Sequence, residues 1–129
     1  MAMKKRKRSS EAETDYLISV RPVHSKSKSM RKTLNISGST PLSQLDQEIR
    51  HVMGYDSGDH LSAFYMGKPH RSPEIATIHP DGGGENSTLT IDELDLSKGA
   101  ELGYVYDFGD DIQSVLTVDE VRPSTHSHP

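Results

Sequence analysis

The feature that most constrains the fold is a single amphipathic helix, expected between Thr40 and Gly54. Thr40 is suited to cap this helix, Pro41 to its first position and Gly54 to its exit. Apolar residues recur at helical spacing and define one buried stripe, formed by Leu42, Leu45, Ile49, Val52 and Met53. The polar positions between them are expected to face mainly solvent: Asp46, Gln47, Glu48 and Arg50. One such stripe predicts a core helix laid across a sheet.

Runs of alternating or apolar residues on both sides of the helix predict the strands of that sheet. Two runs precede the helix, at 16–20 and 33–37, and three follow it, at 60–66, 101–106 and 112–121. Residues 88–94 suggest a short strand or an extended link into a helical turn. The order predicts an α+β fold in which a mixed β-sheet is crossed by one main helix. It is the β-grasp (ubiquitin-like) order with an added C-terminal strand.

The 129 residues provide for one domain with one core. We expect a disordered basic arm at 1–14, an α+β domain at 15–122 and a disordered tail at 123–129. Within the domain, residues 67–86 are rich in glycine and proline and predict one long loop.

Several functional classes are excluded by composition. The chain has no cysteine, which removes disulfides, thiolate zinc sites and cysteine nucleophiles. No apolar run approaches the roughly 18 residues that a membrane span needs, and the basic N-terminus lacks the apolar core of a signal peptide. The sequence therefore predicts a cytoplasmic protein without a membrane partner.

Charge is distributed unevenly along the chain. The net charge of −4 includes +5 from the arm residues Lys4, Lys5, Arg6, Lys7 and Arg8, so residues 9–129 carry −9. Such a body would repel a phosphate backbone over much of its surface, whereas the arm would attract one. The arm is a candidate nucleic-acid contact or nuclear-import signal, and the alternative is a solubilising tail.

The acidic turn after residues 104–106 is the candidate metal site. Asp107, Asp110 and Asp111 crowd five residues, with His60 expected on another strand. Clustered carboxylates could hold Mg²⁺ or Ca²⁺, although their spacing matches no metal-binding loop. The alternative is structural, because Asp and Gly are common residues in tight turns.

No catalytic set stands out, because Ser, His and Asp are all plentiful and their presence discriminates nothing. The sequence favours a small non-enzymatic module without a cofactor that binds a protein or a nucleic acid. The alternative is a divalent-metal-dependent hydrolase or nuclease-like enzyme that uses His60 and the acidic turn. A third possibility is a protein–protein adaptor that uses an exposed sheet edge.

Three stretches together resemble the plasmid pRiA4b ORF-3-like family. They are the helix LSQLDQEIRHVMGY at 42–55, the strand HLSAF at 60–64 and the turn YVYDFGDD at 104–111. The resemblance covers roughly residues 15–121. It implies an association with plasmids and mobile elements, including a passenger protein of an insertion element, and no established activity.

This sequence departs from the family pattern at several positions. Where the resemblance implies a Trp-x-His sequence after the turn, this chain has Ile112 and Ser114, and Asp46 stands in place of a helix histidine. Met30-Arg31 stands where the family often has Trp-Arg. Any chemistry that used the post-turn histidine is therefore not expected here.

Overall fold

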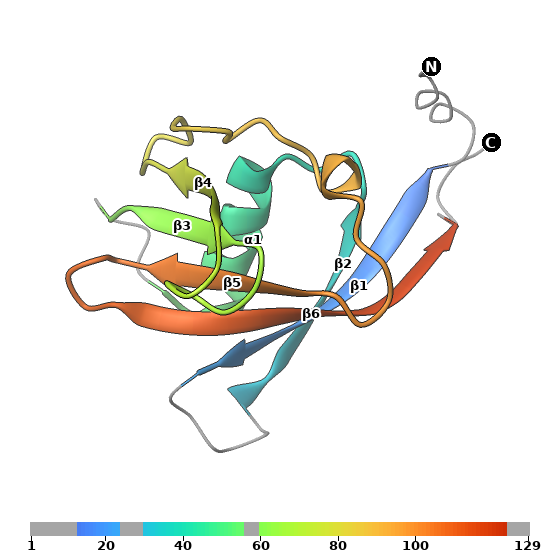
Figure 1. The fold of residues 1–129 in the computed structure, drawn as a ribbon, viewed down its shortest axis with the longest axis horizontal. Helices are drawn as coiled ribbons and strands as arrows, with labels where there is room; N and C mark the ends of the chain where they lie inside the picture. The colour runs from blue at the N-terminus through green and yellow to red at the C-terminus, as the bar shows by residue number, and fades with distance from the viewer. Residues whose placement is uncertain (1–12, 24–29, 56–59, 124–129) are drawn as a thin grey trace.

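The computed structural model describes residues 13–23, 30–55 and 60–123, and the arm residues Lys4–Arg8 lie outside this part. The helix and strands are β1 (Thr14–Pro22), β2 (Lys32–Ser37), α1 (Leu42–Met53), β3 (Ser62–Tyr65), β4 (Glu74–Ile78), β5 (Glu101–Tyr106) and β6 (Ile112–Pro123). A short 3₁₀ helix, η3, covers Asp92–Leu94. The α+β prediction is confirmed (Figure 1). Among the described residues, no helix is long and apolar enough to cross a membrane.

The six strands form one sheet in the order β2-β1-β6-β5-β3-β4. Every neighbouring pair is antiparallel, so the expectation of a mixed sheet is wrong. The reason is the position of β6, which turns back from β5 and inserts between β5 and β1. The β-grasp order is not confirmed by this arrangement.

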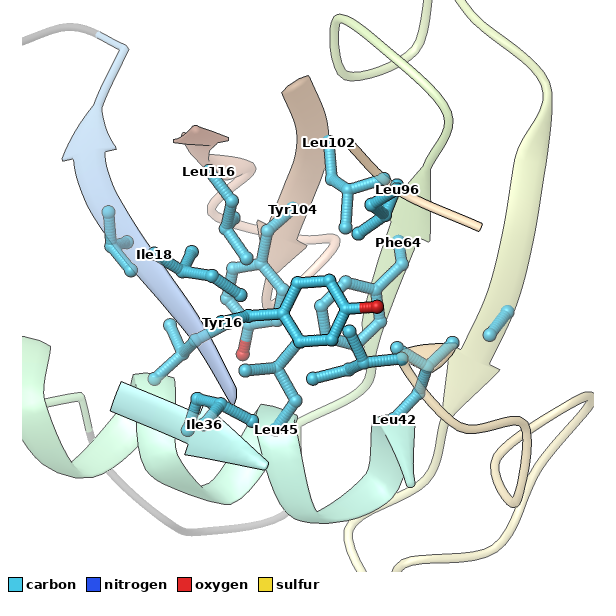
Figure 2. Packing of buried hydrophobic residues seen from close by; sticks show 14 of the residues in the cluster. Tyr16, Ile18, Ile36, Leu42, Leu45, Phe64, Leu96, Leu102, Tyr104 and Leu116 are labelled. Carbon is cyan, nitrogen blue, oxygen red and sulfur yellow. The ribbon is translucent and has the colours of Figure 1, made fainter. Parts of the chain in front are cut away.

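The core lies between α1 and one face of the sheet (Figure 1). Alternate residues of each central strand point toward the helix, as the period of two requires. Leu45 and Ile49 of α1 meet strand residues such as Ile18 and Tyr104, all fully buried. Figure 2 shows the side chains of Ile18, Leu45 and Tyr104 converging above the helix.

Two charged residues of α1 are buried, contrary to the sequence-based expectation. Asp46 is 0% exposed and Arg50 is 2% exposed. Their spacing of four residues places them on one face of the helix, where they form an ion pair. They face the sheet because Ser62 and Tyr104 supply hydrogen-bonding groups there.

Residues 67–86 are not one long loop, because β4 lies within them. Ala76 and Ile78 are buried, and β4 pairs with β3. Residues 83–86 then cover the outer side of this edge strand: the Thr77 amide donates to Glu85 O at 3.0 Å and the His79 amide to Gly83 O at 2.7 Å. This covering protects one edge of the sheet, and β2 forms the other edge.

Candidate functional site

One group of interacting polar side chains lies inside the core. The Asp46 Oδ1 atom accepts hydrogen bonds from Arg50 Nε at 3.2 Å, Ser62 Oγ at 2.5 Å and Tyr104 Oη at 2.6 Å. Arg50 Nη2 also donates to Ser62 Oγ and to the His60 carbonyl oxygen, both at 2.9 Å. Figure 2 shows the Tyr104 ring between sheet and helix. These contacts join α1 to β3 and β5.

The electrostatics of this group favour a fixed, charged pair. Burial alone would lower the pKa of Arg50, but the Asp46 carboxylate and its hydrogen bond raise it above the ordinary value. Burial, reinforced by the Asp46 charge, raises the pKa of Tyr104 strongly, so the phenol stays protonated and donates. Within the described part of the chain, no hydrogen bond reaches Asp46 Oδ2 or Arg50 Nη1, although Oδ2 lies 3.1 Å from Arg50 Nε.

An aromatic cluster covers the outer end of the Arg50 side chain. The guanidinium lies 5.0 Å from the centre of the Tyr106 ring. Tyr55 stacks on the same ring at 4.8 Å, and His60 meets its edge at 5.6 Å. Ser114, where the resemblance implies a histidine, is fully buried, and its Oγ lies 3.4 Å from Tyr55 Oη. We interpret this region as structural, because its polar groups and rings contact one another.

The acidic turn is divided between two neighbours. His60 Nδ1 lies 3.4 Å from Asp107 Oδ2, and Asp107 Oδ1 also accepts the Gly109 amide at 3.1 Å. Asp111 instead lies with its Oδ1 atom 2.7 Å from His70 Nε2. Asp110 is exposed. In the described ranges, no three His, Asp or Glu side chains are grouped to hold one metal ion, so metal binding by these residues stays a prediction.

A hydrogen-bonded chain lies on the opposite face of the sheet from α1. Tyr65 Oη is 3.3 Å from His70 Nδ1, and Gln113 Nε2 donates to Asp111 Oδ2 at 2.9 Å. The Asp111 carboxylate only accepts, so His70 Nε2 donates to it. Burial, with the charges of Glu74 and Asp111, raises the pKa of Tyr65 and keeps its phenol a donor. The chain links β3, the segment after it and the β5–β6 turn.

The segment between β3 and β4, residues 66–73, is held against this outer face of the sheet. We call it the 66–73 loop. It packs on Gly103 of β5, where an added Cβ would lie 2.4 Å from Gly67 O and 2.7 Å from Pro69 N. The Met66 amide donates to Pro73 O at 2.9 Å and closes the base of the loop. His70 adopts a positive φ of 65°, which turns the loop back over the sheet.

A pocket of about 480 Å³ lies between the 66–73 loop and the outer face of β1 and β6. Four of its lining residues are basic, counting the histidine, and none of the described lining residues is acidic. The lining comprises Arg21, Val23, Lys68, Pro69, His70, Arg71, Gln113 and Val115. Arg21 and Val115 are paired neighbours that point away from α1. This pocket can surround a small anion with cationic side chains.

The sequence patterns did not identify these basic residues as a site. Lys68, His70 and Arg71 lie close together in a segment read only as loop, and Arg21 is about fifty positions earlier. The density of bases at 68–71 in an otherwise acidic body is the signal that was available.

Comparison with known proteins supplies a family and a fold. The model of the family described as plasmid pRiA4b ORF-3-like protein matches residues 16–129. No curated protein matches the chain. The chain is also similar to a protein of unknown function, MM3350, from Methanosarcina mazei Go1, known from a crystal structure. The TM-score is 0.60 at 21% identity, and the match covers 91% of this chain but 66% of the other. At this identity the likeness shows the fold alone.

Proposed function

The chain belongs to the plasmid pRiA4b ORF-3-like family, and from that premise we propose that it is a non-enzymatic binding module whose ligand is an anion. The single observation that carries the proposal is the pocket lining, in which Arg21, Lys68 and Arg71 surround one hollow beside His70. Arginine guanidinium groups bind phosphate and carboxylate oxygens through paired donors, and lysine adds a mobile positive charge.

The surroundings make this concentration of positive charge informative. Residues 9–129 carry a net charge of −9, and yet three lysine or arginine side chains border one small pocket. Asp111, the carboxylate of the hydrogen-bonded chain that includes the lining residues His70 and Gln113, forms hydrogen bonds with both of them. A local excess of positive charge in a concave site attracts anions even where the protein as a whole repels them.

The proposal is tested by titrating the protein with pyrophosphate and following its amide NMR signals. We expect the shifts to concentrate at Arg21, Gln113 and the 66–73 loop. The double variant Arg21→Ala/Arg71→Ala should bind at least tenfold more weakly, because hydrogen bonds to charged groups contribute about 1.5–3 kcal/mol each. Arg122→Ala is the matched control, since Arg122 is exposed and paired with Glu120. Equal affinities for all three proteins would reject the proposal.

A metal-dependent hydrolase or nuclease is the second candidate, favoured by the approach of His60 Nδ1 to Asp107 Oδ2 at 3.4 Å. Its test is a Mn²⁺ titration of the protein and of Asp110→Asn. Asp110 is exposed, so the substitution should leave folding nearly unchanged. Loss of Mn²⁺-induced line broadening at His60 and the acidic turn in this variant would support the candidate. Absence of such broadening in the unsubstituted protein would remove it.

A further inference from the structure

We infer that the anion in this pocket is the phosphate of a nucleotide, whose base lies against the apolar part of the lining. The inference rests on the proposed function and names its ligand class. It also makes a separate claim, because a pocket that only neutralises charge has no need of an apolar surface. The lining here is divided between basic side chains and a distinct apolar set.

The apolar set consists of Val23, Pro69 and Val115. Pro69 and Val115 are buried, and Val23 is partly buried, whereas Arg21, Lys68 and Arg71 are exposed. The pocket therefore has an apolar floor and a basic rim. Little of Pro69 and Val115 is accessible, so the apolar surface open to a base belongs mainly to Val23 and to the aliphatic parts of the basic side chains. An inorganic anion held at the rim would leave this surface in water, but a planar base attached to the phosphate would cover it. Removing apolar surface from water contributes roughly 25 cal/mol per Å².

Two further features fit a base better than an aliphatic group. The lining includes Gln113, whose amide can exchange hydrogen bonds with the edge of a base. Arg21 and Arg71 carry planar guanidinium groups, which stack on bases and also bind phosphate. The volume of about 480 Å³ falls within the roughly 300–1,000 Å³ of small-ligand pockets. It suits one nucleotide, either free or as a unit of a single strand.

The experiment compares ligands that carry the phosphate alone, the base alone or both, by amide NMR titration of the full chain. The probes are inorganic phosphate, the four ribonucleoside 5′-monophosphates and the corresponding nucleosides. We expect at least one monophosphate to bind tenfold or more tightly than phosphate, with shifts at Val23, Gln113 and Val115. Comparing thymidine 5′-monophosphate with a hexathymidylate strand identifies the source. Similar affinities per nucleotide indicate a free nucleotide, and a much tighter strand indicates single-stranded nucleic acid.

A volume-conserving substitution tests the floor itself. Val23→Thr replaces a methyl group of a partly exposed side chain with a hydroxyl, and we expect it to weaken the best monophosphate about fourfold while leaving phosphate binding unchanged. Val121→Thr is the control, because Val121 is exposed and lies outside the pocket lining.

The possible failures are distinguishable. If phosphate shifts the pocket amides but no monophosphate binds more tightly, the inference is overturned and the anion-binding proposal stands. An unchanged ratio of monophosphate to phosphate affinity in Val23→Thr overturns it as well. If neither ligand perturbs the pocket, both proposals fail.

Discussion

At the scale of single residues, the buried ion pair Asp46–Arg50 is the least expected feature of the core. Both charges lose their hydration, and this cost is offset only because Ser62, Tyr104 and the His60 carbonyl supply hydrogen bonds. Removing one partner of such a pair is costly, because the other charge is left buried and unpaired. The pair also fixes the position of α1 over β3 and β5, because its donors and acceptors must meet at defined distances.

We expect Asp46→Leu and Arg50→Met each to lower the free energy of unfolding by about 3–5 kcal/mol, since each leaves one buried charge unpaired. The double variant should be much closer to the unsubstituted protein, because neither charge then remains. Urea unfolding at neutral pH measures the three values. Additive losses in the double variant would mean that the two side chains do not act as a pair.

The raised pKa of Tyr104 predicts a loss of stability at alkaline pH. Burial and the Asp46 charge hold its phenol protonated in the folded protein, whereas the phenol in the unfolded chain ionises near pH 10. The folded state therefore binds more protons above about pH 10, and the free energy of unfolding should fall as pH rises from there. Tyr104→Phe should lower stability at pH 7 by about 1.5–3 kcal/mol and reduce this alkaline decline.

Ser62→Ala is the matched control for that measurement. It also removes a hydrogen bond to Asp46, but it leaves the titrating phenol in place. It should lower stability at pH 7 and keep the full alkaline decline. An equal decline in Tyr104→Phe and in the unsubstituted protein would show that Tyr104 is not the group responsible.

At the scale of elements, the 66–73 loop and β5 are coupled through Gly103. Here the glycine is required by space, because an added methyl group would meet Gly67 O at 2.4 Å and Pro69 N at 2.7 Å. These are backbone atoms and cannot rotate away as a side chain can. The loop must therefore move if this position gains a side chain, and the pocket beneath it must change shape.

We expect Gly103→Ala to lower the free energy of unfolding by roughly 1–3 kcal/mol, as overpacking does, and to weaken pyrophosphate binding at least tenfold. Thermal unfolding and the NMR titration measure the two effects. Gly109→Ala is the control, since its Cβ would lie at an ordinary 3.4 Å from Asp107 Oδ1 in an exposed turn. Unaltered pyrophosphate affinity in Gly103→Ala would mean that the loop does not shape the site.

Much of the element order could be predicted from local patterns, and the long-range features could not. The helix from Leu42 and the strand at 101–106 follow from periodicity. The short strand β4 was missed because Pro73 and Pro80 flank it and its pairing with β3 is a tertiary contact. The insertion of β6 between β1 and β5 has no local signal. The burial of Asp46 was missed because its partner Tyr104 is distant in sequence.

The candidate site divides in the same way. The acidic turn is predictable because its residues lie close together in the sequence. That Asp107 contacts His60 while Asp111 contacts His70 depends on which strands lie beside the turn. The basic pocket combines β1, β6 and the 66–73 loop, so it can be located only from the order of the strands in the sheet.

At the scale of the whole molecule, the two proposed contacts for a nucleic acid are basic regions on a body of opposite charge. One is the arm residues Lys4–Arg8 and the other is the pocket rim. They differ in the physics of binding. Five like charges in a row neutralise phosphates without recognising the shape of the ligand, and their contribution to binding depends strongly on salt. A pocket with an apolar floor binds one unit and depends less on salt.

A chain starting at Glu11 should separate these two contributions. We expect it to lose most of its affinity for duplex DNA, and the slope of log K against log salt should become shallower by about 4–5, because each neutralised phosphate contributes about 0.9. Fluorescence anisotropy at several NaCl concentrations measures both quantities. Pyrophosphate affinity should stay unchanged, since the pocket lining lies entirely within residues 21–115. Equal DNA binding with and without the arm would contradict the role of Lys4–Arg8 and would leave the pocket rim as the surface to test next.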